Sequence, residues 1–379
     1  MYIVSDQDAQ FGESVAAAVQ AAGGLKIARS VGAGDKATAR QIWNGVADLF
    51  QLLIPEPLGG LGLGLDSAVL PLMALGADLV PGPFAETLQA LTWALGGPAE
   101  PVRAHWSGQF QDGAPVITMP FAAPRTPGRL TPQQNGGPVR ASGVFEYVPY
   151  ADDASYLALG PGLLADGAAP EGLQALMVPL GSPGVRIEMR PTMDASRPVG
   201  VVFLDQVQVA EPNLLLRGSG AAGTALGSWP DVALTATAAM QLGALARLVE
   251  SSAEHGRNRI QFGQPIGRYQ GIKHRIANMK LSLEGARALV YQAADDLSTG
   301  HGDSPVIPAA SAYVTDALTE AATANIQIHG AMGYTAEFDA HLYLKRAHAW
   351  RLVGGGPDRN RELSLARKGW LAAGIGNPA

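Results

Sequence analysis

The sequence contains no cysteine, and this absence excludes several kinds of site at once. Disulfide bonds, thiolate metal ligands and a cysteine nucleophile all require that residue. Charged residues are also scarce, at 16% of the chain, and the formal net charge is −6. General nucleic-acid binding is therefore disfavoured, because it requires a basic face.

Long apolar runs are missing as well. No stretch reaches the roughly 18 uninterrupted apolar residues that a membrane-spanning helix needs. The first residues, MYIVSDQDAQFGESV, have neither the basic region nor the apolar core of a signal peptide. We therefore expect a cytoplasmic protein without a membrane span.

What is present is a high apolar content and a change of hydrophobic period along the chain. Hydrophobic residues make up 47% of 379 residues, which is enough for two or three domains with large buried cores. Residues 1–113 and 221–379 have helical spacing, whereas residues 114–220 hold short β-branched runs between Gly, Pro and Asp. The sequence thus predicts a mainly α protein with a central β domain, a small barrel or sandwich. Strands are expected at 114–121, 139–148, 155–161, 173–180, 185–189 and 199–209.

Two stretches of the sequence carry a recognisable pattern. Residues 257–280 read RNRIQFGQPIGRYQGIKHRIANMK, and residues 327–338 read QIHGAMGYTAEF. They resemble the Arg-x-x-Phe-Gly-x-x-Ile and Gln-Ile-x-Gly-Gly-x-Gly-Tyr motifs of acyl-CoA dehydrogenases. The N-terminal segment LLIPEPLGGLGLGLDSAV resembles the same family, so the resemblance covers nearly the whole chain.

This resemblance implies a fold, a cofactor and a reaction. The family fold is an N-terminal helical domain, a β-barrel or sandwich middle domain and a C-terminal four-helix bundle. In the family, FAD lies between the β domain of one subunit and the C-terminal domain of its neighbour. A glutamate takes the α proton of an acyl-CoA thioester, flavin N5 takes the β hydride, and electron-transfer flavoprotein accepts the electrons.

The first motif implies three contacts to the cofactor. Arg259 corresponds to the family arginine that reaches across the dimer to the FAD pyrophosphate, and a guanidinium fork suits phosphate oxygens. A lone arginine can equally be a surface helix charge. Phe262 would pack on the adenosine side or fill the interface. Gln270 would hydrogen-bond in the same region or be a solvated helix residue.

The second motif implies a close approach of backbone to phosphate. Gln327, Gly330 and Ala331 correspond to the segment that meets the pyrophosphate of the neighbour's FAD. Small residues are needed there so that backbone and phosphate can meet. Alanine replaces the usual second glycine at position 331. Gly330 can also end a helix, and the two roles are compatible.

The motifs that hold the flavin ring in typical members are degraded here. The Thr-Glu-Pro-x-x-Gly-Ser-Asp-type motif corresponds to residues 119–130, where Phe121, Ala122 and Ala123 cannot donate a side-chain hydrogen bond. The family's Trp-Ile-Thr aligns with Tyr-Val-Pro. Tyr147 could still stack on the ring, but Pro149 has neither a hydroxyl nor an N–H.

The catalytic glutamate of the family also lacks a counterpart. In most members it aligns with Gly354, and in a minority it aligns with Ala233 on an earlier helix. A general base must lie within about 3 Å of the proton it removes. Asp231 points about 200° away from Ala233 and is expected to be an ordinary first-turn acid. We therefore predict no catalytic residue in this chain, and no metal site.

The losses affect this chain's own flavin ring and substrate, whereas the groups offered to a neighbour are kept. We therefore hypothesise a non-catalytic subunit of a heteromeric α2β2 acyl-CoA dehydrogenase, whose partner supplies the glutamate. The segment VPGPF resembles bacterial steroid-degrading members, which favours a bulky, steroid-derived acyl-CoA. A homomeric flavoenzyme with a non-standard base remains open, as does a flavin-free scaffold or acyl-CoA-binding protein.

Overall fold

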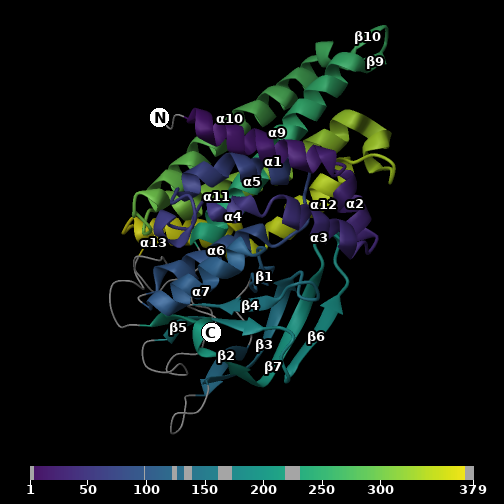
Figure 1. Cartoon of the computed structure of the whole chain (residues 1–379). Helices are drawn as coiled ribbons and strands as arrows, with labels where there is room; N and C mark the ends of the chain where they lie inside the picture. Colours follow the sequence, from purple (N-terminus) through teal and green to yellow (C-terminus); the bar gives the residue numbers. More distant parts are fainter. Residues whose placement is uncertain are drawn as a thin grey trace.

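The computed structural model places the N- and C-terminal helices together in one body, with the strands beneath them (Figure 1). The predicted fold class, mainly α with a central β domain, is confirmed. Division into domains at residues 113 and 220 stays a prediction. The structure describes residues 4–97, 99–121, 126–131, 139–160, 173–217 and 231–371.

The helices fall into an N-terminal and a C-terminal group. The first group is α1 (Asp6–Ala21), α2 (Lys26–Gly32), α3 (Lys36–Gly45), α4 (Asp48–Gln51), η1 (Glu56–Leu58), η2 (Leu65–Ala68), α5 (Val69–Ala77), α6 (Phe84–Gly96) and α7 (Glu100–Gln111). The second group is α9 (Asp231–Asn258), η4 (Ile266–Arg268), α10 (Gln270–Ser298), α11 (Val306–His329), η5 (Gly330–Tyr334), α12 (Ala340–Trp350), η6 (Val353–Gly355) and α13 (Gly356–Arg367).

Helix α9 is the centre of the helical body. It is apolar on nearly every side, as expected of a helix buried by neighbours all round, and it packs against α5, α6, α10 and α11. Within the described residues it is the one helix long and apolar enough to cross a membrane, but 83% of its apolar window is buried. It is therefore a core helix.

Two glycines let α5 and α9 cross with their backbones in contact. A Cβ on Gly76 would lie 1.8 Å from the Met240 carbonyl oxygen, and a Cβ on Gly243 would lie 1.9 Å from the Met73 carbonyl oxygen. Neither distance is physically possible, so any larger residue would force the helices apart. The N-terminal helices and the C-terminal bundle consequently share one hydrophobic core.

The strands form two four-stranded sheets that pack into a sandwich. One sheet has the order β1 (Ile117–Thr118), β4 (Tyr156–Leu159), β5 (Leu173–Pro179), β8 (Leu214–Arg217). The other has the order β2 (Thr126–Thr131), β3 (Val139–Pro149), β7 (Val199–Val209), β6 (Val185–Arg190). Neighbouring strands are antiparallel except for the parallel pair β1 and β4. Buried Phe145 and Val202 from the second sheet meet Leu157 and Val178 from the first.

Two strands of the sandwich were not predicted from the sequence. Strand β2 contains proline and glycine, which argue against a strand, but it lies at a sheet edge where a missing backbone donor is tolerated. Strand β8 reads LLLR, a short apolar run with no alternation that marks it as a strand. The short helix η6 and the start of α13 fall at the three consecutive glycines 354–356.

A narrow arm projects from the helical body. Helices α9 and α10 run past their neighbours and are joined by a hairpin of β9 (Ile260–Gln261) and β10 (Gln264–Pro265) (Figure 1). The two turn residues, Phe262 and Gly263, have φ of +51° and +80°, as in the primed turns that suit tight hairpins. We call residues 257–280 the projecting arm.

Candidate functional site

The first predicted cofactor residues lie on the projecting arm and face solvent. Arg259 and Gln270 are exposed, and their side chains form no ion pair or hydrogen bond with any described residue. Phe262 is 93% exposed at the tip, where its ring has an edge contact with Tyr269 at a centroid distance of 6.4 Å. A large apolar ring held in solvent by a tight turn marks a contact surface.

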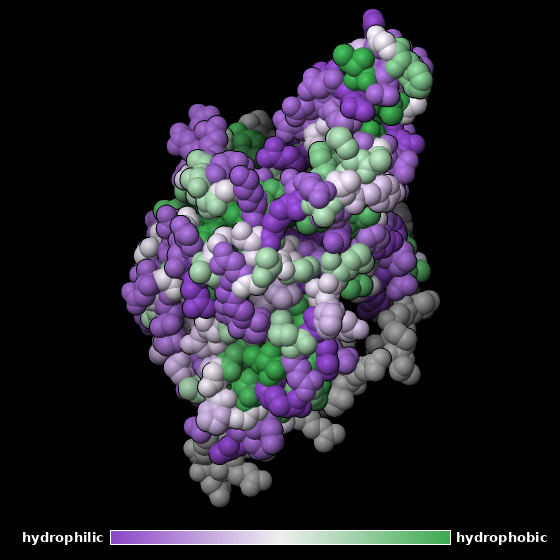
Figure 2. All heavy atoms as spheres, turned by 90° about the vertical axis from the view of Figure 1, so that its right-hand side faces the viewer, coloured by the Kyte–Doolittle hydropathy of each residue, from purple (hydrophilic) through white to green (hydrophobic). Residues whose placement is uncertain are grey.

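The charge of the arm is unlike that of the whole chain. The chain carries a net charge of −6, yet residues 257–280 contain six basic residues and no acidic one. Figure 2 shows the arm projecting from the body, with hydrophilic surface interrupted by hydrophobic side chains near its end. Such a surface suits an anionic ligand or an acidic partner. The basic residues are Arg257, Arg259, Arg268, Lys273, Arg275 and Lys280.

The second predicted group lies at the base of the same arm. Gln327, Gly330 and Ala331 are exposed where α11 ends and η5 begins. The rings of His255 on α9 and His329 on α11 are 4.1 Å apart, which places this turn close to Arg259. The two motifs therefore meet through His255, four residues before Arg259, and His329, next to Gly330, whereas Phe262 lies at the tip of the arm.

The backbone at this turn is open to a ligand. Gly330 has φ +65°, and a Cβ placed on it would meet no atom within 4 Å. Burial lowers the pKa of both His255 and His329, so the pair stays neutral near pH 7 and adds no charge to the site. Exposed Arg259, which forms no ion pair with a described residue, and the open glycine turn are groups that can bind phosphate oxygens.

Gly354, which the sequence resemblance aligned with the family's catalytic glutamate, is a closely packed glycine. Gly354 has φ +64°, and a Cβ placed on it would lie 2.5 Å from Cδ2 of Leu234. Leu234 is 1% exposed. Of the adjacent pair on α9, Leu234 rather than Ala233 is therefore the side chain that meets Gly354. Neither of the two aligned positions carries a carboxylate. One is Gly354, and the other is Ala233 with Leu234 beside it.

Asp231 takes a structural role. Both of its carboxylate oxygens accept from Nη2 of Arg367 at 2.9 Å, and the two side chains are 1% and 7% exposed. Burial raises the pKa of the Asp231 carboxyl to about 7, and the paired Arg367 opposes that rise. The carboxyl thus joins the start of α9 to the end of α13.

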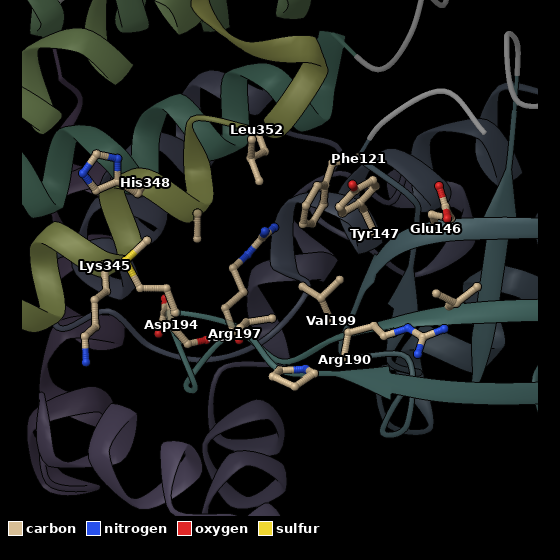
Figure 3. Close-up of a pocket in the computed structure, with 16 residues that line it drawn as sticks. Phe121, Glu146, Tyr147, Arg190, Asp194, Arg197, Val199, Lys345, His348 and Leu352 are labelled. Carbon is tan, nitrogen blue, oxygen red and sulfur yellow. Dashed lines mark hydrogen bonds between the residues drawn. The ribbon is translucent and has the colours of Figure 1, made fainter. Parts of the chain in front are cut away.

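The residues aligned with the ring-holding motifs border a cavity beside α12 (Figure 3). Tyr147 lies in a bulge of β3 with φ +56°, and its ring stacks on Phe121 at a centroid distance of 6.4 Å. Pro149 instead faces the body, where its carbonyl accepts from the Thr118 hydroxyl at 2.5 Å. Ala122 and Ala123 lie outside the described residues.

Sequence reasoning missed the buried charges beneath this cavity. Arg197 donates to Glu86 at 2.9 Å, and Arg346 donates to Asp194 at 2.5 Å. Burial raises the pKa of Glu86, while Arg346 and other donors outweigh burial and lower the pKa of Asp194. The only indication of them in the sequence is that Asp194 and Arg197 both lie in the segment MDASRP. Their partners, Arg346 and Glu86, are too distant in the sequence to be identified from the sequence alone. Across the described ranges, no three His, Asp or Glu side chains gather as metal ligands.

The sequence of this chain matches one protein family and several known proteins. Residues 233–368 match the family described as acyl-CoA dehydrogenase, C-terminal domain. The L-prolyl-(peptidyl-carrier protein) dehydrogenase of Pseudomonas fluorescens is 30% identical over 355 residues, covering 87% of this chain and 90% of its own. Acyl-CoA dehydrogenase IpdE2 of Mycobacterium tuberculosis is 29% identical over 342 residues, with 89% of each chain covered.

A solved structure gives the same fold over the whole chain. A chain of the ChsE4–ChsE5 complex from Mycobacterium tuberculosis superposes with a TM-score of 0.83 at 23% identity, covering 98% of this chain and 99% of that chain. The sequence match, the relative at 30% identity and the order of helices and sheets agree. This chain therefore belongs to the acyl-CoA dehydrogenase family, whose members use FAD.

Proposed function

We propose that this chain is the non-catalytic subunit of a heteromeric, FAD-dependent acyl-CoA dehydrogenase. The observation that carries the proposal is the packing at Gly354, where Leu234 fills the space that a base would need. A carboxylate cannot be supplied from either aligned position, so the partner subunit supplies it. The contrast with Arg259, which is exposed and forms no ion pair with any described residue, supports a chain that contributes to a neighbour's site.

The arm and the glycine turn would complete the partner's FAD site. Arg259 would donate to the pyrophosphate, and the open backbone at Gly330 and Ala331 would let the phosphates approach. Phe262 would fill an apolar recess of the partner, and Gln270 and Gln327 would hydrogen-bond beside it. FAD supplies the hydride acceptor for α,β-desaturation, with electron-transfer flavoprotein as the family's electron acceptor.

The relatives support the assembly and the substrate class. One similar solved structure is itself a complex of two named chains, ChsE4 and ChsE5, and another, Tcur3481–Tcur3483, is named a steroid acyl-CoA dehydrogenase. We infer an α2β2 assembly with two FAD molecules that acts on a bulky acyl-CoA such as a steroid-derived thioester. The catalytic partner is expected to be a homologous chain that carries the glutamate.

Counting FAD per complex tests this proposal directly. Expressed alone, the chain is expected to be colourless or insoluble, and to acquire yellow flavin only when it is co-expressed with its partner. Native mass spectrometry of the complex should give two copies of each chain and two FAD molecules. One FAD per chain in a homotetramer would favour the homomeric enzyme instead, and a flavin-free complex would favour a scaffold or acyl-CoA-binding protein.

Arg259→Ala is expected to weaken FAD retention by the complex. Losing a charge-assisted hydrogen bond to phosphate costs about 1.5–3 kcal/mol, or roughly ten- to a hundredfold in affinity. Arg257→Ala is the matched control, because it removes the same charge from an exposed site in the last turn of α9. FAD released on dilution, followed by its fluorescence, measures the difference. Equal release from the two variants would contradict the role of Arg259.

A further inference from the structure

The cavity beside α12 has the character of a ligand site. Its volume is about 380 Å³, within the usual size range of small-molecule pockets. The β sandwich supplies one wall and α12 with the segment after it supplies the other (Figure 3). Most of the lining is apolar, and its apolar members include Phe121, Tyr147, Met193, Val199 and Leu352.

One nitrogen of a buried arginine in this cavity has no acceptor among the described residues. Arg197 is 4% exposed, and only its Nη2 has a carboxylate partner, Glu86. Its Nη1 is buried without a hydrogen bond to any described residue. The guanidinium carbon lies 4.5 Å from the centre of the Phe121 ring, and Figure 3 shows the group between Leu352 and Phe121. A buried N–H without an acceptor is costly, so an acceptor from outside the chain is expected here.

Charged side chains of both signs line the cavity. Arg190, Arg197 and Lys345 line it against Glu146 and Asp194, and Asp194 is already neutralised by an arginine outside the lining. Lys345 forms no ion pair within the described part of the chain. Figure 3 places Tyr147 between Arg197 and Glu146, so the acid does not face the guanidinium directly. Arg190 and Arg197 are each paired with a glutamate outside the lining, which leaves Lys345 as the lining cation without an ion pair among the described residues.

We propose that this cavity binds a small ligand with an apolar, ring-sized body and a carboxylate. The carboxylate would accept from Arg197, and the body would lie against Phe121, Tyr147 and Leu352. A carboxylate matches the guanidinium fork better than a neutral carbonyl does. The site is built by this chain alone, and the proposal does not depend on the FAD role of the projecting arm.

Two isosteric probes test the charge requirement. Calorimetric titration of the full-length chain, purified with its partner if the two copurify, would compare 2-naphthoate with 2-naphthamide. The naphthoate is expected to bind at least about tenfold more tightly, because only its head is an anion. This comparison needs no variant. No binding of naphthoate, or equal binding of the two probes, would overturn the proposal.

Two variants then assign the effect to Arg197. Glu86→Gln keeps the guanidinium and removes its competing carboxylate, so naphthoate should bind as tightly as before or more tightly. Glu86→Gln combined with Arg197→Met removes the pair without stranding a buried carboxylate, and should lower naphthoate affinity by about tenfold or more. Unchanged naphthoate affinity in the double variant would contradict the assignment.

Discussion

Replacing Phe262 by alanine is expected to weaken assembly with the partner subunit by about 2–4 kcal/mol, or roughly thirty- to a thousandfold. Buried aromatic rings contribute much of the binding energy at protein interfaces, and truncating such a ring leaves a cavity. In this chain the ring is 93% exposed, so its removal costs the folded subunit almost nothing. Analytical ultracentrifugation of the mixed subunits would measure the loss.

The turn that holds Phe262 needs its own control. The residue has φ +51°, a conformation that strains phenylalanine and alanine alike, so a second variant with a residue suited to the turn separates the ring from the turn. Phe262→Asn removes the ring and suits the first position of this turn. Both variants should lose affinity alike, with unchanged thermal stability of the isolated subunit. If Phe262→Asn assembled normally, the turn rather than the ring would be responsible.

An exposed apolar residue elsewhere provides a second comparison. Leu61 is 41% exposed in the N-terminal region, away from the projecting arm. Leu61→Ala removes apolar surface of a similar kind and should leave assembly unchanged. A general loss of affinity in this variant as well would indicate nonspecific hydrophobic association rather than a docked ring.

The fold class and the arm could be predicted because their signals are local. Helical spacing and the two motifs lie in continuous stretches, and both motifs fall on the arm or at its base in the structure. The convergence of Arg259 with Gly330 was supplied by the family resemblance. The structure adds the physical reason, which is the contact between His255 and His329.

The buried charge pairs could not be predicted, because their partners are distant in sequence. Glu86 and Arg197 are separated by 111 positions, and Asp194 and Arg346 by 152. Nothing in the sequence around either arginine selects its partner. Pairing depends on how the sandwich docks against α6 and α12, which is a property of tertiary packing.

The rotation between neighbouring residues on α9 determines which of Ala233 and Leu234 faces Gly354. Alignment by spacing alone placed Ala233 at the second glutamate position, but neighbouring residues on a helix point about 100° apart. The structure turns Leu234 toward Gly354 and buries Ala233 at 5% exposure against other residues. Of this adjacent pair, Leu234 is therefore the side chain that packs against Gly354.

Gly354→Glu is expected to destabilise the subunit by about 2–5 kcal/mol without creating dehydrogenase activity. A residue with a Cβ at φ +64° is strained, and the Cβ would lie 2.5 Å from Leu234 Cδ2. The new carboxylate would also be placed against an apolar side chain. Urea unfolding measures the loss, and flavin reduction by an acyl-CoA thioester tests for activity.

Gly355 provides a control that separates backbone strain from the steric clash with Leu234. Gly355 has φ +82°, and its Cβ would meet only the Arg359 side chain, at 3.0 Å for the nearest atom. Gly354→Ala should therefore cost more than Gly355→Ala by the energy of the Leu234 contact, about 1–3 kcal/mol. Combining Leu234→Ala with Gly354→Ala should recover that difference as a favourable coupling in a double-mutant cycle.

If Leu234→Ala with Gly354→Glu gained flavin reduction in the subunit alone, the chain would possess a usable active site of its own. The proposed division of labour between two subunits would then fail.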